Sequence, residues 1–301
     1  MTYSIVAWGD DGRLGVGVQT CVMGVGAVCS WARAGVGAVA TQAFSERGYG
    51  PRLLDRLASG ESPGQALQAL RAEDGRREQR QVAVVAADGS TAAFTGADTI
   101  ADAGDVQGDG LSCQANMMAR PGVPEAMREA YLVAPGSLER RILAALEAAE
   151  AAGGDFRGRQ SAALLVVGAE PADEPWQGVE TDLRVDDDRA PLEALRRLVD
   201  VAEAYRLVNE GTEAAKRGEV DAAAHSAARA RALAPHDQNV LAFDAMLRAG
   251  GGDLEQLRQL IARRPGTIRL VEWLHAHGEL PLSDDAVAAL RRMIDSTTPH
   301  V

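Results

Sequence analysis

Apolar and polar positions at the start of the chain follow the pattern of a β-hairpin. Small and β-branched residues fill most of positions 1–7 and 14–20, and the segment Asp10-Asp11-Gly12 lies between them. Asp-Gly flanked by such runs is one of the stronger short-range signals for a hairpin turn. We therefore expect the first residues to be a strand of a sheet, with no leader or loose tail before them.

Further strands are indicated by short apolar runs that carry no charge on either face, which is typical of strands buried between two layers. Such runs predict strands over residues 24–28, 35–42 and 162–167. The more polar segments 111–116 and 180–185 are further strand candidates, and a second hairpin covers 81–94 around Asp88-Gly89. Helices are predicted from apolar residues at helical spacing over 51–58, 62–73, 124–131 and 137–152. Gly153-Gly154 is expected to end the last of them.

Blocks of strands that alternate with pairs of helices predict two stacked sheets with helices on the outside, which is an α+β domain. From about residue 191 the pattern changes to nearly continuous helix. We therefore divide the chain into a sheet domain over residues 1–190 and a helical domain over residues 191–301.

The helical domain carries a pattern that recurs at a fixed distance. Its first predicted turn, Gly218-Glu219-Val220-Asp221, recurs as Gly252-Asp253-Leu254-Glu255. The two glycines are 34 residues apart, which is the period of the tetratricopeptide repeat. Residues 270–293 would then form a degenerate third unit that caps the array. An unspecialised helical bundle remains the alternative, because alanine-rich helices match loose patterns easily.

The acidic composition of the chain limits its partners and its location. A formal net charge of -12 argues against nucleic acid and anionic membranes, because both reward a basic patch, and small neutral or cationic ligands fit better. Cys21, Cys29 and Cys113 form neither a paired framework nor a metal-type spacing, which points to a reducing compartment. Since no apolar run of about 18 residues is present, we expect a cytoplasmic protein.

The motifs indicate neither a metal site nor a cofactor site. His275 and His277 are two positions apart, so on a helix they point to different faces and cannot share a metal ion. Gly35 to Ala40 matches the G-x-G-x-x-A form of a dinucleotide fingerprint, but Val39 and Thr41 favour a strand where that fingerprint needs a helix. A nicotinamide oxidoreductase is therefore the weakest of the functions that we consider.

The chemistry open to the sheet domain is limited by its basic side chains, all of which are arginine. The first Lys is Lys216 and the first His is His225, so a Ser-His-Asp or Cys-His arrangement cannot form from this domain alone. The α-amino group of residue 2, once Met1 is removed, has an unperturbed pKa of about 8 and suits a general base. Thr2 is small enough for removal of Met1 to be expected, and a Thr hydroxyl activated by its own terminal amine is a recognised nucleophile.

Several motifs, taken in chain order, resemble one family. They are Ser4 to Ala7, Gly35 to Gln42, Thr95-Gly96, Gln114 to Asn116 and Ala152 to Ala163. Together they resemble the domain of unknown function 1028 (DUF1028) family, which looks like a branch of the N-terminal nucleophile (Ntn) hydrolases. The resemblance covers residues 1–190, and it implies a four-layer αββα fold and hydrolysis of an amide bond. Some members of that family carry an extra C-terminal helical domain, as this chain does.

The resemblance also implies which residues react. Thr2 stands where the nucleophile of the wider superfamily stands, and Ser4 lies two positions along the same strand and on the same face. Either hydroxyl could react, although Ser4 would need two more residues removed to become terminal. The chain departs from proteasome-like members by having no Lys in the domain, and Arg33 cannot act as a base. It also reads Gln114-Ala115-Asn116 where a Gly is common before the Asn.

Polar residues at strand ends complete the candidate site, and each also has a purely structural interpretation. Asn116 is a candidate donor to an oxyanion, or else it caps the end of a strand. Thr41 and Gln42 either line a pocket or form a satisfied polar pair at the edge of a sheet. The remaining candidates form either a substrate-orienting loop or a loop held together by an Asp-Arg pair: Asp155, Arg157, Gln160 and Ser161.

Two functions follow from these residues. The first is an Ntn-type amidohydrolase that attacks a small amide or peptide-like bond through Thr2 or Ser4. The second is a non-catalytic protein that keeps the pocket to bind a metabolite, while its helical repeats recruit a protein or peptide partner. We also expect a homo-oligomer, which the helical domain could stabilise, and we expect neither nucleic acid nor a membrane as a partner.

Overall fold

Strand β1 (Thr2–Trp8) is the element around which the first part of the structure is arranged. The structure is a computed structural model, which describes residues 2–174, 176–280 and 282–295. β1 forms the predicted hairpin with β2 (Leu14–Thr20), and Gly12 in the connecting turn has a φ of +81°. Glycine adopts this left-handed conformation without the strain that a Cβ atom adds. The N-terminal hairpin is therefore confirmed.

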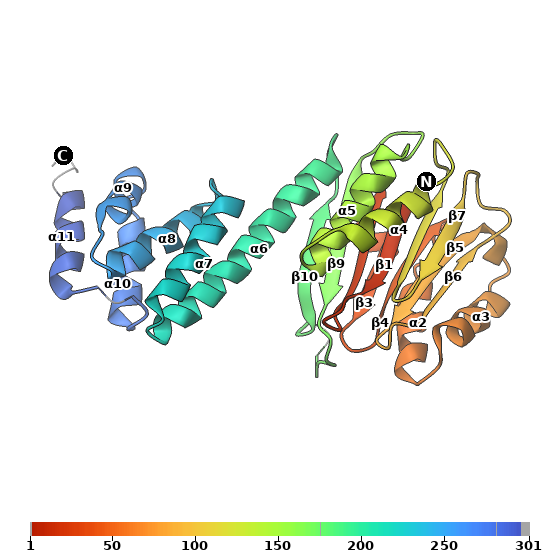
Figure 1. The fold of residues 1–301 in the computed structure, drawn as a ribbon, viewed down its shortest axis with the longest axis horizontal. Helices are drawn as coiled ribbons and strands as arrows, with labels where there is room; N and C mark the ends of the chain where they lie inside the picture. Colours follow the sequence, from red (N-terminus) through yellow and green to blue (C-terminus); the bar gives the residue numbers. More distant parts are fainter. Residues whose placement is uncertain (1, 175, 281, 296–301) are drawn as a thin grey trace. The chain divides into compact units, whose positions relative to one another are not determined.

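Two antiparallel sheets lie in the first part of the structure (Figure 1). The larger sheet has the order β10-β9-β2-β1-β8-β7, so β1 is hydrogen-bonded on both sides, to β2 and to β8 (Leu111–Asn116). Its other strands are β7 (Gly104–Gly108), β9 (Ser161–Val167) and β10 (Val179–Val185). The smaller sheet has the order β3-β4-β5-β6, formed by β3 (Ser30–Arg33), β4 (Gly37–Ala43), β5 (Arg80–Ala86) and β6 (Thr91–Thr95).

The helices of this part begin and end close to the predicted residues. The four predicted helices are α2 (Tyr49–Ala58), α3 (Pro63–Glu73), α4 (Val123–Val133) and α5 (Leu138–Ala151), and a short 3₁₀ helix, η1 (Arg77–Gln79), was not predicted. Ser62 starts α3 with a complete capping box. Its side chain accepts from the main-chain N–H of Gln65, and its own main-chain N–H donates to Gln65 Oε1. Gly153 and Gly154, both at positive φ, end α5 as expected.

Three hydrophobic clusters determine how these elements pack. One lies between the two sheets and includes Val6 and Val85. A second lies on the other face of the larger sheet, where Ile5 packs with Ile142 under helices α4 and α5 (Figure 1). The third lies between the outer face of the smaller sheet and helices α2 and α3. Successive side chains of a strand point to opposite faces, so Ile5 faces the helices while Val6 faces the other sheet.

One local prediction for the sheets is wrong, and two strands were not predicted. Residues 24–28 were expected to form a strand, but Gly26–Cys29 form the short helix α1, after a turn in which Gly24 has a φ of +72°. The N–H groups of Val28 and Cys29 both donate to the carbonyl of Val25, and short apolar runs do not distinguish helix from strand by periodicity alone. Strands β3 and β7 were not predicted, because β3 has only four residues and β7 has a single apolar residue, Val106, between polar residues and glycines.

The chain divides into two compact units, Met1–Val199 and Asp200–Val301. Helix α6 (Pro191–Lys216) starts in the first unit and ends in the second. The predicted boundary after residue 190 falls at the start of this helix, and the independence of the two domains stays a prediction.

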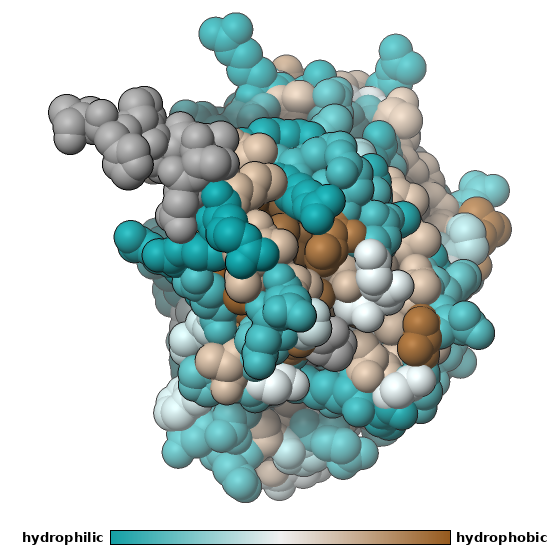
Figure 2. Space-filling view, turned by 90° about the vertical axis from the view of Figure 1, so that its left-hand side faces the viewer, coloured by the Kyte–Doolittle hydropathy of each residue, from teal (hydrophilic) through white to brown (hydrophobic). Residues whose placement is uncertain are grey.

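The second unit is helical, as expected from its sequence. After α6 it contains α7 (Val220–Leu233), α8 (Gln238–Gly250), α9 (Glu255–Arg263), α10 (Thr267–Ala276) and α11 (Asp284–Asp295). The recurring glycines lie between helices, Gly218 with a φ of +76° and Gly252 with a φ of +95°. Figure 2 shows a face of this unit on which hydrophilic side chains surround a small group of hydrophobic ones. Among the helices that the structure describes, none has the length and apolar character needed to cross a membrane.

Two helical glycines provide a test of the packing between α2 and the smaller sheet. A Cβ atom on Gly50 of α2 would lie 2.2 Å from the ring of Trp31, whereas one on Gly64 of α3 would meet nothing within 4 Å. We expect Gly50→Ala to lower the free energy of unfolding by about 1–3 kcal/mol, because the helix must move away from the strand. Gly64→Ala, the matched control, should raise it by a few tenths of a kcal/mol, because alanine favours a helix.

Urea unfolding followed by circular dichroism measures both changes. Equal effects of the two substitutions would contradict the packing of α2 against Trp31.

Candidate functional site

Polar side chains replace the apolar core between the two sheets at the end of β1 where Thr2 lies. Further along the same interface the core is apolar and includes Val6, Ala40 and Val85. Burying so many polar groups is tolerated only when each of them is hydrogen-bonded. The polar residues point inward from β1, β4, β5 and β8, and each is at most 1% exposed: Ser4, Gln42, Gln81, Gln114 and Asn116.

Ser4 lies at the centre of this polar set, with its hydroxyl engaged both as donor and as acceptor. The hydroxyl donates to Gln42 Oε1 at 2.6 Å and accepts from Gln114 Nε2 at 2.6 Å. Gln42 must present its oxygen to Ser4, because its Nε2 faces the main-chain carbonyl oxygens of Thr2 and Gln114, which only accept. The proton of Ser4 is therefore directed at an amide oxygen, which is too weakly basic to take it at neutral pH.

Thr2 begins β1 between Thr20 of β2 and Asn116 of β8. Its hydroxyl donates to Thr20 Oγ1 at 3.2 Å. Its carbonyl oxygen accepts from Gln42 Nε2 at 3.2 Å and from Asn116 Nδ2 at 3.4 Å. The structure thus brings together four residues that the sequence singled out separately, because Thr2, Ser4, Gln42 and Asn116 all lie at one end of the space between the sheets.

Thr41 is adjacent to Gln42 in sequence but points to the other side of β4. Since side chains alternate along a strand, Thr41 lies on the same face as Val39, which packs under helices α2 and α3. Its hydroxyl donates to the main-chain oxygen of Glu46 at 3.3 Å. Of the predicted pair, Gln42 lies with Thr2 and Thr41 does not.

The buried carboxylate of Asp155 ties the loop after α5 to the end of β2. It accepts from the main-chain N–H of Cys21 at 3.2 Å, from the N–H of Arg157 at 2.8 Å and from the Arg157 guanidinium at 3.4 Å. The Arg157 side chain is 35% exposed, whereas that of Asp155 is buried. The pair therefore holds the loop together and also leaves a partly exposed cation near the strand end that carries Thr20.

Gln160 and Ser161 also form hydrogen bonds to the end of β2 and to the segment that follows it. The main-chain N–H of Gln160 donates to the carbonyl oxygen of Thr20 at 2.9 Å, while its side chain donates to Asp187 at 3.0 Å. The hydroxyl of Ser161 accepts from the N–H of Val25 at 3.2 Å and donates to the carbonyl oxygen of Val22. Both residues position the segment that follows Thr20, and the Gln160 side chain points to the acidic loop after β10.

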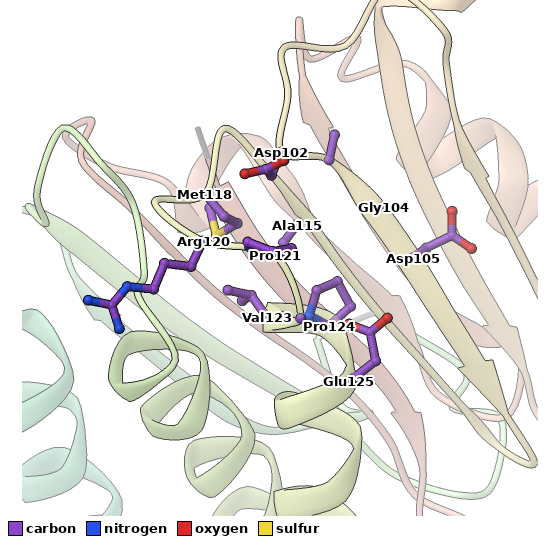
Figure 3. A pocket seen from close by; sticks show the side chains of 12 residues that line it. Asp102, Gly104, Asp105, Ala115, Met118, Arg120, Pro121, Val123, Pro124 and Glu125 are labelled. Atoms are coloured by element: carbon purple, nitrogen blue, oxygen red, sulfur yellow. The ribbon is translucent and has the colours of Figure 1, made fainter.

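A pocket of about 200 Å³ lies beside this site, at the start of helix α4 (Figure 3). Its wall includes Asp102, Asp105, Met118, Arg120 and Glu125, and it includes none of the predicted site residues. Asp105 nevertheless connects it to the buried polar set, since its carboxylate accepts from the Thr95 hydroxyl at 2.6 Å and Thr95 in turn accepts from Gln81 Nε2 at 3.0 Å.

Gln81, Thr95, Asp105 and Thr20 belong to the site but were missed in the sequence. The available signal was a Gln, Ser or Thr at an inward-facing position of a strand that is otherwise apolar, as in Gln81-Val82-Ala83-Val84-Val85.

Two other candidates are settled by backbone geometry. The G-x-G-x-x-A segment continues into strand β4 and does not open a helix, and Arg33 lies at the opposite end of the smaller sheet, paired with Asp55.

Burial determines the chemistry of the cysteines. It raises the pKa of the Cys29 thiol to about 12 and that of Cys113 well above its usual range. Burial and then the nearby Asp155 carboxylate raise the pKa of Cys21, which is partly exposed. Among the described residues, no group of three or more His, Cys, Asp or Glu side chains is arranged to hold a metal ion.

Comparisons with known proteins agree on one family for the first unit. The model of the family of unknown function DUF1028 matches residues 2–195. A crystal structure of a protein from Silicibacter pomeroyi, described as a DUF1028 protein, superposes with a TM-score of 0.59 at 32% sequence identity. The match covers 66% of this chain and 87% of that one. A search of the curated proteins found no match.

Ser4→Ala tests the buried polar set. The substitution leaves the Gln114 amide and the Gln42 oxygen without their partner inside the protein, so we expect it to lower the free energy of unfolding by about 1–3 kcal/mol. Ser59→Ala, which removes an exposed hydroxyl bonded to the Arg56 carbonyl, is the control and should change it by less than about 0.5 kcal/mol. Denaturant unfolding measures both, and a neutral Ser4→Ala would contradict the assigned network.

Alkylation with iodoacetamide at pH 8 tests the thiols. A thiol with a pKa of about 12 is ionised to only about one part in ten thousand at this pH. We expect intact mass to show slow modification of Cys21 and none of Cys29 or Cys113 in the folded protein. Unfolded protein should take up three adducts, and rapid labelling of Cys29 in the folded protein would contradict its burial.

Proposed function

The chain belongs to the DUF1028 family, and on that premise we propose that it is an amidohydrolase of the N-terminal nucleophile type. The order of layers supports this class. Helices α4 and α5, the larger sheet, the smaller sheet, and helices α2 and α3 follow one another through the three hydrophobic clusters. We interpret this order as the αββα sandwich, with the reacting residue at the start of a central strand.

Thr2, and not Ser4, is the nucleophile in this proposal. The single observation that carries it is the difference between their hydrogen bonds. The Ser4 hydroxyl is completely buried, with its proton directed at one amide and its lone pair at another. Thr2 is also buried, at 6% exposure, but it lies at the end of the strand, where its hydroxyl donates to that of Thr20. In this proposal the hydroxyl turns from Thr20 toward the substrate.

The base is the α-amino group of Thr2 after removal of Met1. Residues 2–199 contain neither Lys nor His, and an α-amino group with a pKa of about 8 accepts a proton at neutral pH. The Thr2 oxygen attacks the amide carbon while its proton passes to this amine. The same proton then goes to the leaving nitrogen, and water releases the acyl group from the oxygen.

The remaining candidate residues hold and border this group. Asn116 and Gln42 donate to the carbonyl oxygen of Thr2 and so set the orientation of the residue that reacts. Asp155, Gln160 and Ser161 anchor the loop beside Thr20, and Arg157 supplies the partly exposed cation of that loop. We assign to this cation the binding of a polar or anionic group on a small amide substrate.

The helical unit serves a separate purpose, which is contact with a protein or peptide partner or with a second copy of the chain. Stacked helix pairs present an extended surface that suits such contacts. Leu270 and Trp273 are about half exposed on α10, at 47% and 55%, and Trp273 stacks on His277 with ring centroids 4.1 Å apart. The glycine turns 34 residues apart support a tetratricopeptide-like repeat.

The competing function is binding of a metabolite without turnover. The observation that favours it is the absence of Lys and His from the sheet unit, which leaves no side chain to lower the pKa of the nucleophile as an ammonium group would. In that case the buried amides would serve as structural hydrogen bonds alone, and Thr2 would have no chemical role.

Intact mass and a covalent probe separate the two functions. We expect the purified protein to lack Met1, and 4-nitrophenyl acetate to acetylate Thr2. Thr2→Ala should abolish this modification, with a rate loss of about a thousandfold or more, and it should leave the circular dichroism spectrum unchanged.

Ser59→Ala, which removes an exposed hydroxyl at the C-terminal end of α2, should react like the wild type. A retained Met1, or a Thr2→Ala protein that reacts like the wild type, would favour binding without catalysis.

A further inference from the structure

We infer that Gln81 is a positioning residue, which sets the direction of the buried amides so that both Gln42 and Asn116 donate to the carbonyl oxygen of Thr2. The inference rests on the proposed role of Thr2 as nucleophile. It assigns a function to a residue of β5, in the sheet opposite the one that carries Thr2.

The orientation of the Gln81 amide is determined by the main chain. Its Nε2 lies 2.9 Å from the carbonyl oxygen of Ala115 and 3.1 Å from that of Gly104, and these oxygens can only accept. The third neighbour of Nε2 is the Thr95 hydroxyl at 3.0 Å, whose proton is directed at the Asp105 carboxylate at 2.6 Å. The nitrogen of Gln81 must therefore face this side and its oxygen must face the other.

The oxygen of Gln81 in turn orients two more amides. Gln81 Oε1 accepts from Gln42 Nε2 at 2.7 Å and from Asn116 Nδ2 at 2.8 Å. Both nitrogens also reach the carbonyl oxygen of Thr2, at 3.2 Å and 3.4 Å. If Gln81 presented its nitrogen instead, either amide would have to turn its oxygen toward Gln81 and would then lose its donation to Thr2.

The direction of donation then continues to Ser4. With its nitrogen turned to Gln81 and Thr2, Gln42 presents Oε1 to the Ser4 hydroxyl, and Ser4 accepts from Gln114 Nε2. Gln114 Oε1 accepts from the Ser112 hydroxyl at 3.1 Å. The direction of every hydrogen bond in the set is therefore determined, because its amide nitrogens face main-chain carbonyl oxygens, which can only accept.

The consequence for function is that the main chain of residue 2 is held by donors on two different strands. A carbonyl oxygen bonded from both sides limits rotation of the peptide that follows Thr2, and therefore limits the directions that its hydroxyl and amine can take. Reacting groups must be aligned within a fraction of an ångström, and misplacement by about 1 Å costs roughly a hundredfold in rate.

Gln81→Glu tests the orientation without any assay of activity. The variant keeps the shape of the side chain but places a carboxylate oxygen against two carbonyl oxygens, so burial and this repulsion raise the pKa of the new acid above the unfolded value of about 4.3. Its stability relative to the wild type is highest below about pH 4.3, where the protonated acid can donate one hydrogen bond in place of the amide's two, and falls as the pH rises toward the raised pKa of the folded state.

Thermal unfolding at pH 5 and pH 8 measures this difference, with Gln68→Glu on the exposed face of α3 as the matched control. We expect the midpoint of Gln81→Glu to fall by more than about 5 °C relative to the control over this interval. Equal pH dependence in the two variants would overturn the inference.

Gln81→Met tests the effect on residue 2. Methionine has a similar length but neither donates nor accepts at this position, so we expect acetylation of Thr2 by 4-nitrophenyl acetate at pH 7.5 to slow about tenfold or more. Peptide mapping locates the adduct, and Gln68→Met is the control, expected to react like the wild type. Wild-type rates in a folded Gln81→Met protein would overturn the inference.

The two arms separate this inference from the proposed function. If the wild-type protein is not acetylated at Thr2, the assignment of Thr2 as nucleophile fails, and the pH dependence of Gln81→Glu still decides how the amide is oriented. If Thr2 reacts normally while Gln81→Met has no effect, the proposed function stands and the role of Gln81 falls.

Discussion

The carbonyl oxygen of Thr2 accepts from two buried amides, those of Gln42 on β4 of the smaller sheet and of Asn116 on β8 beside β1. The structure of this end of the interface between the sheets depends on that contact. Apolar side chains at this end would have avoided a possible loss of stability, because each buried amide without a hydrogen-bond partner lowers the free energy of unfolding by about 1–3 kcal/mol. The chain instead satisfies these amides through one another and through main-chain carbonyls. The result is a hydrogen-bonded polar end on a sheet interface that is apolar elsewhere.

This arrangement compensates for a shortage in the composition of the sheet unit. Arginine provides all of its basic side chains, and arginine does not exchange protons near neutral pH. In our account the main chain of residue 2 provides the base, and the neighbouring amides provide alignment. Neutral amides suit that task because they hold the carbonyl without adding a charge to a buried site.

Much of the fold could be predicted from the sequence, because the unit alternates clear apolar strands with capped helices. The hairpin around Gly12, the capping box at Ser62 and the glycines after α5 all carry local signals that the structure reproduces. The segment 24–28 and strand β7 could not be predicted, since a short apolar run suits helix and strand alike and an edge strand needs no apolar pattern.

The site could also be predicted in part from local sequence signals. Thr2, Ser4, Gln42 and Asn116 stand at strand ends with unusual polarity, and they converge between the sheets. Thr41 does not join them, because adjacent strand residues face opposite ways. Gln81 had a sequence signal, since it is a polar residue at the start of an otherwise apolar strand. Its role could not be predicted, because that role depends on the carbonyl groups of Gly104 and Ala115, which only the folded structure brings to it.

The most direct test of the account is to insert one alanine between Met1 and Thr2. The insertion keeps the threonine hydroxyl and the whole buried network but moves the terminal amine to another residue. We expect the rate at which 4-nitrophenyl acetate acetylates the threonine to fall by about a hundredfold or more, while the unfolding temperature stays close to that of the wild type. An unchanged rate in the folded insertion protein would contradict the claim that the α-amine of residue 2 is the base.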